Sequence, residues 1–178
     1  HLQHLVDLSR EQAECWGYED KLYDALIDRF ERGATSAALA NTLGQLREAL
    51  IPVVEEATSR APLDRRPLVG SYPVERQQAF NREVAESIGF DFEAGRIDTA
   101  VHPFCSGMAP YDTRLTTRYD EADFLSSLFG VLHEAGHGLY EQGLPKDWHG
   151  QPIGQAVSLG VHESQSRLWE NHVGRSLG

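Results

Sequence analysis

The feature that most constrains this chain is a helical pattern of apolar residues between residues 120 and 142, which ends in GVLHEAGHGLYEQ (130–142). Apolar positions recur every three or four residues, and this period predicts a helix with one face buried against a core. Asp120 is suited to cap the start of the helix, and Gly143 and Pro145 are suited to end it. The predicted buried stripe consists of Leu125, Leu128, Phe129, Leu132, Gly136, Leu139 and Tyr140.

Two histidines lie along the edge of this stripe. His133 and His137 are four residues apart, so on a helix they project from the same side. Two imidazoles one turn apart can bind a single metal ion, and Glu134 then lies beside the ion without having to coordinate it. This HExxH pattern is the motif of zinc hydrolases. The residues leave one alternative open, which is a pair of core histidines that form hydrogen bonds only.

A catalytic zinc ion needs a third protein ligand and an open fourth position. Glu163 is the candidate, because a lone buried carboxylate would be costly and a metal ion would remove that cost. Arg167 and its polar neighbours are suited to hold this carboxylate in place. Gly136 and Gly138 each cost a helix about 1 kcal/mol relative to alanine. We therefore expect another backbone or a substrate to approach the helix closely at these two glycines.

The rest of the chain is predicted to be mainly helical. Apolar periodicity indicates helices over residues 19–31, from residue 36 to a kink or end at Pro52, and over 73–89. A last helix is expected to start near Pro152 and to carry Glu163. The helix that starts at residue 36 has a seam predicted to pack against another helix, formed by Leu39, Leu43, Leu46, Leu50 and Val53.

Two segments alternate with a period of two, residues 96–104 and 111–119, and we predict strands paired through a turn at 107–110. The expected fold class is therefore mainly α, with a small antiparallel β hairpin or sheet beside the helix that carries HExxH. One interpretation of the strands is an edge that aligns an extended peptide, with His102 and Arg114 facing a cleft. The alternative is a structural hairpin. For Arg114 the two stay equally open.

Composition narrows the function classes. Asp and Glu number 27 against 16 Lys and Arg, and the formal net charge is −11, so binding to nucleic acid or to an anionic membrane is not expected. No run of about 18 apolar residues is present, so no membrane span is expected. Two cysteines in 178 residues are typical of a reducing compartment, and we expect the cytoplasm.

Taken together, several segments resemble the carboxypeptidase Taq family of metallocarboxypeptidases. The resemblance lies in DFEAGRIDTAVHPF, in DTRLTTRYDEADFLSSLFGVLHEAGHGLYEQGLP and in AVSLGVHESQSRLWENHVGRS. These segments contain three family signatures in order: HPF at 102–104, DxRxT at 112–116, and HExxH followed by HESQ at 162–165. The resemblance is nearly continuous from about Gln77 to Arg175.

This resemblance implies a zincin-like helical fold, one Zn²⁺ or Co²⁺ ion per chain, peptide substrates that lose C-terminal residues, and a homodimer. Its residue roles, carried over by position, make His133, His137 and Glu163 the metal ligands and Glu134 the catalytic residue. His102 and Arg114 belong to motifs on the cleft wall and are expected to bind substrate. Asp112 and Arg167 are expected to contact the metal-binding and substrate-binding side chains and to hold them in place. For Asp112 we favour a structural role.

The chain is much shorter than members of that family. We expect one catalytic-core domain over residues 1–178, cut from a longer protein, with a helical scaffold over 1–90 and the sheet and metal-binding helices over 91–178. Two alternatives stay open: a truncated, inactive metal-binding helical module, and an endopeptidase of the thermolysin type.

Overall fold

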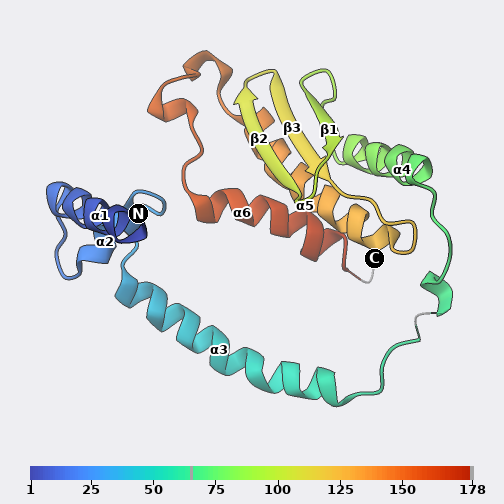
Figure 1. Ribbon diagram of the computed structural model, residues 1–178, viewed down its shortest axis with the longest axis horizontal. Helices are drawn as coiled ribbons and strands as arrows, with labels where there is room; N and C mark the ends of the chain where they lie inside the picture. The colour runs from blue at the N-terminus through green and yellow to red at the C-terminus, as the bar shows by residue number, and fades with distance from the viewer. Residues whose placement is uncertain (65, 177–178) are drawn as a thin grey trace. The chain divides into compact units, whose positions relative to one another are not determined.

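The computed structural model describes residues 1–64 and 66–176. The chain divides into two compact units, His1–Asp64 and Arg65–Gly178, and each is treated by itself. Among the helices of the described residues, none is both long enough and apolar enough to cross a membrane. The predicted fold class is confirmed, because the described chain is mainly helical with a three-stranded sheet (Figure 1).

The first unit consists of three helices: α1 (Leu2–Trp16), α2 (Leu22–Asp28) and α3 (Ser36–Ser59). The α1 helix was not predicted. The carboxylate of Asp24 in α2 accepts a hydrogen bond of 2.7 Å from the backbone N–H of Ser36, which joins α2 to the start of α3. The α3 helix runs through Pro52 to Ser59, so of the predicted kink or end at Pro52 the end is wrong. No residue of α3 is buried, and the packing predicted for its leucine seam is not found among the described residues of this unit.

The second unit contains the sheet and the remaining helices. Its elements are η1 (Arg66–Leu68), α4 (Val74–Ser87), β1 (Gly95–Thr99), β2 (Phe104–Ala109), β3 (Asp112–Thr117), α5 (Phe124–Gly143), η2 (Lys146–Trp148), η3 (Pro152–Gly154), α6 (Leu159–Arg167) and the π-helix η4 (Leu168–Val173).

The sheet is mixed, with strand order β1-β3-β2. The strands β2 and β3 form an antiparallel pair. The predicted antiparallel pairing of residues 96–104 with 111–119 is wrong, because β1 pairs with β3 in parallel. The predicted strand over 96–104 is confirmed only as far as Thr99, where β1 ends, and of the rest only Phe104 lies in a strand. Pro103, which has no N–H to donate, precedes β2, and β2 continues to Ala109 into the predicted turn. Thr113, Leu115 and Thr117 of β3 are buried as the predicted alternation requires, but Thr116 on the other face is buried as well, so the alternation does not extend to the end of the strand.

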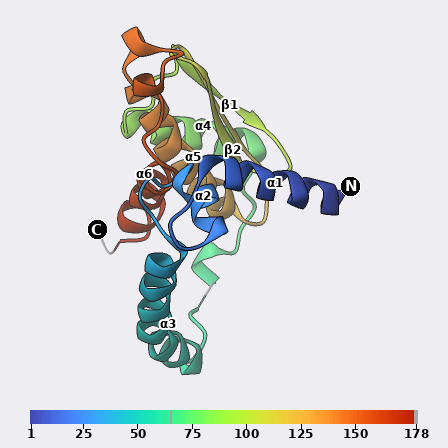
Figure 2. The same cartoon turned by 90° about the vertical axis from the view of Figure 1, so that its left-hand side faces the viewer.

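The α5 helix is the central element of this unit. The sheet packs on one side of it and α6 on another (Figures 1 and 2). The core between α5, α4 and the sheet is formed by Ala85, Phe90, Leu115, Val131 and Ala135. This packing places the histidine-bearing face of α5 against α6.

Two predicted helix starts are wrong. The α5 helix begins at Phe124, because Asp120 caps a preceding turn by accepting a hydrogen bond from the N–H of Ala122. The last helix begins at Leu159, where the hydroxyl of Ser158 accepts a hydrogen bond from the N–H of Val161.

The close approach of another backbone predicted at the two glycines is confirmed at Gly136, whereas at Gly138 the close neighbours are side chains. A Cβ atom built at Gly136 would lie 2.5 Å from the carbonyl oxygen of Gln165 and 2.6 Å from Cα of Ser166, both backbone atoms of α6. At Gly138 the nearest atom would be 2.6 Å away on the ring of Phe90. Gly136 therefore allows the backbones of α5 and α6 to touch, directly beside Glu163.

We expect the substitution Gly136→Ala to lower the free energy of unfolding. Alanine gains about 1 kcal/mol of helix propensity, but overpacking typically costs about 1–3 kcal/mol, and the clash here is with backbone that can move only as a whole helix. Chemical denaturation measures the change. The matched control is Gly143→Ala on the same helix, where a Cβ meets no atom within 4 Å and stability should be retained or raised. A Gly136→Ala protein as stable as this control would contradict the prediction.

Candidate metal centre

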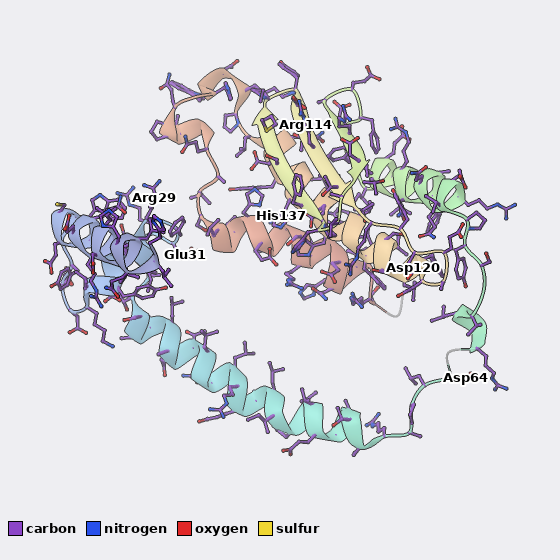
Figure 3. The ribbon with its side chains drawn as sticks, in the orientation of Figure 1. Arg29, Glu31, Asp64, Arg114, Asp120 and His137 are labelled. Carbon is purple, nitrogen blue, oxygen red and sulfur yellow. The ribbon has the colours of Figure 1, made fainter. Side chains whose placement is uncertain are left out.

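Three side chains from α5 and α6 converge on one point. His133 and His137 lie on α5 and Glu163 lies on α6, and one ligand atom of each is within 4.8 Å of the others. Nε2 of His137 is 3.2 Å from Oε2 of Glu163, and Nε2 of His133 is 3.7 Å from the same oxygen. Figure 3 shows His137 at this junction, between α5 and α6. Two imidazole nitrogens and one carboxylate oxygen are a set of donors that suits Zn²⁺ or a similar divalent cation.

The nitrogen and oxygen atoms of the cluster face one another with their lone pairs, and this arrangement favours a bound cation. Nδ1 of His133 is 2.8 Å from Oε2 of Glu170, so this nitrogen carries the proton and donates a hydrogen bond to the carboxylate. A neutral His133 then has only a lone pair on Nε2, and that lone pair faces the carboxylate of Glu163. Two lone pairs at such a distance repel each other unless a proton or a metal ion lies between them. Simple core histidines would not gain from this arrangement.

Glu163 is half-exposed and is held by its own helix. Nε of Arg167 donates a hydrogen bond of 2.8 Å to Oε1 of Glu163, which leaves Oε2 to face the histidines. Burial would raise the pKa of Glu163, but the nearby His133 and the hydrogen bonds from Arg167 and Ser166 outweigh burial and lower it. The carboxylate is therefore ionised over a wide pH range. The contact that we predicted between Arg167 and this carboxylate is present.

Glu134 lies on the buried side of the cluster and is 7% exposed. Its burial raises the pKa of the carboxyl, only partly offset by the charge of His133. A carboxyl with a raised pKa is suited to exchange protons near neutral pH. A cavity of about 480 Å³ opens beside it, and the lining includes His102, Phe129, His133, Glu134 and Arg175.

His102 and Arg114, the two residues predicted to bind substrate, lie in different places. His102 lines the cavity next to Glu134, and its Nδ1 donates a hydrogen bond of 2.8 Å to the carbonyl oxygen of Pro103. Arg114 lies on the exposed face of β3, where Asp112 accepts two hydrogen bonds from its guanidinium, at 2.8 and 2.6 Å. Arg114 is not part of the cavity lining, and Figure 3 shows it on the strands, away from His137.

Three polar residues of the site were missed by sequence reasoning. Glu170 contacts Nδ1 of His133. His162 contacts Nδ1 of His137, and Glu141 in turn contacts Nε2 of His162. A spacing signal was available for two of them. Glu141 is four residues after His137, and Glu170 is seven after Glu163, so each shares a helix face with a candidate ligand. For His162 only the contact between α5 and α6 shows its partner.

Comparison with known proteins agrees with this geometry. A family model described as carboxypeptidase Taq (M32) metallopeptidase matches residues 1–178. Thermostable carboxypeptidase 1 of Thermus thermophilus is 50% identical over 160 residues, which are 89% of this chain and 31% of that protein. Carboxypeptidase 1 of Bacillus subtilis is 38% identical over 177 residues, which are 99% of this chain and 35% of that protein.

Solved structures show the same relationship. The crystal structure of an M32 carboxypeptidase from Deinococcus radiodurans R1 matches with a TM-score of 0.89 and 41% identity, over 98% of this chain and 35% of that one. A structure described as the BsuCP crystal structure matches with the same TM-score and 38% identity, again over 98% of this chain and 35% of that one. The chain therefore spans about a third of the length of the relatives that it matches.

Proposed function

This chain belongs to the carboxypeptidase Taq (M32) metallopeptidase family, as the resemblance implied, and from this premise we propose that it forms the metal centre of a metal-dependent carboxypeptidase. The proposed reaction is hydrolysis of the C-terminal peptide bond of peptides. The observation that carries the proposal is the convergence of Nε2 of His133, Nε2 of His137 and Oε2 of Glu163 beside a buried glutamate. Because the chain spans only a third of its relatives, substrate range is also part of the proposal.

His133, His137 and Glu163 would hold one divalent cation per chain, Zn²⁺ or Co²⁺. Such a cation supplies Lewis acidity, which polarises the scissile carbonyl group and lowers the pKa of a water molecule at the site. Glu170 and Arg167 keep His133 and Glu163 oriented through the hydrogen bonds described above. The protein thus contributes a preformed set of donors whose free lone pairs already point at one position.

Glu134 is proposed to act as the general base and then as the general acid. Its carboxylate takes a proton from the attacking water, and it delivers that proton to the leaving amine nitrogen as the peptide bond breaks. Its burial supports this role, because a raised pKa brings proton uptake and release closer to neutral pH. His102 lines the same cavity and is proposed to contact the bound peptide. For Arg114 a substrate-binding role stays a prediction, since Asp112 holds its guanidinium on the exposed face of β3.

The remaining expectations are proposals of the same kind. We propose peptide substrates, no nucleic acid or membrane partner, a homodimer, a cytoplasmic location and a single catalytic-core domain over residues 1–178. The net charge of −11 supports the absence of nucleic acid partners. The cytoplasmic proposal is supported by the low cysteine content, two in 178 residues.

A peptide assay tests the proposed reaction. The purified chain, loaded with Zn²⁺, is incubated with a short synthetic peptide that carries either a free C-terminal carboxylate or a C-terminal amide. We expect loss of the C-terminal residue from the free peptide only, and mass spectrometry identifies the products. The zinc-free protein and the Zn²⁺-loaded Glu134→Gln variant serve as controls and should release nothing.

Other outcomes separate the alternatives. Cleavage inside the amidated peptide would favour an endopeptidase of the thermolysin type. Stoichiometric zinc binding with no hydrolysis of either peptide would favour the inactive metal-binding module for this chain.

A further inference from the structure

A chain of hydrogen-bonding groups leads from His137 on α5 to His162 on α6 and back to Glu141 on α5. Nδ1 of His137 lies 2.6 Å from Nδ1 of His162, and Nε2 of His162 lies 2.7 Å from Oε1 of Glu141. From these contacts we propose that His162 and Glu141 are positioning residues, which hold His137 in the one tautomer that can bind a metal ion through Nε2. This inference rests on the proposed function, because it takes His137 to be a ligand.

The direction of the hydrogen bonds follows from what each group can donate. An ionised carboxylate only accepts, so Nε2 of His162 must carry the proton that Glu141 receives. A neutral imidazole has one N–H, so Nδ1 of His162 is left as an acceptor. Nδ1 of His137 must then be the donor at 2.6 Å. Its single proton is used there, and Nε2 of His137 is left with a free lone pair directed at the point that it shares with Glu163.

The ring of His162 is also held in place by packing. It lies between the ring of His137, with centroids 4.7 Å apart, and the ring of Tyr140, with centroids 5.0 Å apart. The side chains of His162 and Glu141 are only 18% and 21% exposed, which limits competition from water. Because Glu141 lies one turn after His137 on α5 and His162 lies next to Glu163 on α6, the chain also ties the two ligand-bearing helices together.

The two ligand histidines are therefore held in different ways. His133 donates directly to the carboxylate of Glu170, whereas His137 reaches the carboxylate of Glu141 through a second imidazole. Carboxylate partners of this kind orient ligand histidines and raise their basicity, and their loss typically costs about 10–100-fold in metal affinity. A purely structural histidine at position 162 would affect folding stability and leave zinc affinity unchanged.

The test compares zinc affinity in four variants, measured by competition with a chromophoric chelator. His162→Leu and Glu141→Leu remove the acceptors, and we expect each to weaken binding about 10–100-fold. His162→Gln and Glu141→Gln each retain an amide oxygen that can accept the same hydrogen bond, and they should stay within a few fold of the wild type. His4→Leu removes an exposed imidazole from α1 in the first unit and is the matched control.

Two further measurements separate positioning from folding and from the proposed function. Visible spectra of the Co²⁺-loaded proteins should change in the leucine variants and not in the glutamine variants. The melting temperatures of the metal-free variants should not rank in the same order as their zinc affinities. Equal zinc affinities for the leucine and glutamine variants, or a leucine variant within twofold of the wild type, would overturn the inference while leaving the metal centre intact. A wild-type protein that binds no zinc would refute the proposed function as well.

Discussion

Glu134→Gln is expected to abolish peptidase activity while the protein still binds its metal ion. Glutamine has nearly the same shape but cannot take a proton from water, and loss of general acid–base catalysis typically costs about 10²–10⁴-fold in rate. The kcat of the metal-loaded variant should therefore fall by this factor, with KM little changed. Steady-state hydrolysis of a peptide with a free C-terminus gives both constants, and the chelator competition gives the metal affinity.

The same substitution should leave folding intact or improve it. Burial raises the pKa of Glu134 in the folded protein, so the ionised group costs stability once the pH exceeds its ordinary pKa. That cost grows as the pH rises toward and through the raised pKa, and a neutral glutamine does not carry it. Glu83→Gln, at an exposed position of α4, is the matched control and should change neither activity nor stability. A Glu134→Gln protein that retains turnover close to that of this control would exclude Glu134 as the proton acceptor.

Glu163→Gln is expected to have the largest effect on metal binding. Glu163 supplies the only carboxylate oxygen in the three-residue cluster, and an amide oxygen without negative charge is a much weaker ligand for Zn²⁺. We expect a loss of zinc affinity of at least about a hundredfold, on the scale of the binding energies of zinc ligands. Isothermal titration of the metal-free protein with Zn²⁺ measures it.

Thermal unfolding provides an independent measurement of the same loss. A ligand that binds only the folded state raises the melting temperature, so Zn²⁺ should stabilise the wild type and not Glu163→Gln. Glu75→Gln removes an exposed carboxylate at the start of α4 and should retain the full zinc-dependent shift. If zinc stabilises Glu163→Gln as much as it stabilises Glu75→Gln, the metal ion binds elsewhere in the chain.

Much of the candidate site could be predicted because its signals are local. The four-residue spacing of His133 and His137 places both side chains on the same face of a helix, and the apolar stripe beside them requires that helix to be buried on one face. Glycine inside α5 signalled close contact, and Gly136 indeed touches the backbone of α6. Glu163 does lie at the cluster as predicted, but the burial from which it was chosen is not found, because its side chain is 44% exposed.

Predictions that depended on partners far apart in sequence were less accurate. The parallel pairing of β1 with β3 requires the chain to cross over, and strand alternation carries no information about the direction of a neighbour. Asp120 and Pro152 are residue types that often start helices, yet Asp123 and Ser158 occupy the cap positions. The packing of α5 and α6 sets where each helix can begin.

The sequence by itself determined that α5 is an amphipathic helix, that His133 and His137 share one side of it, and that Glu134 lies between them. Helical geometry repeats every 3.6 residues, so a short spacing is enough to place these groups. Only the tertiary structure decided which nitrogen of each imidazole is free. Glu170 and His162 meet the ligand histidines across the α5–α6 contact, and such contacts depend on how two helices pack. Orientation of a side chain is set by its partners in space, and these are separated here by 25 to 37 positions in the chain.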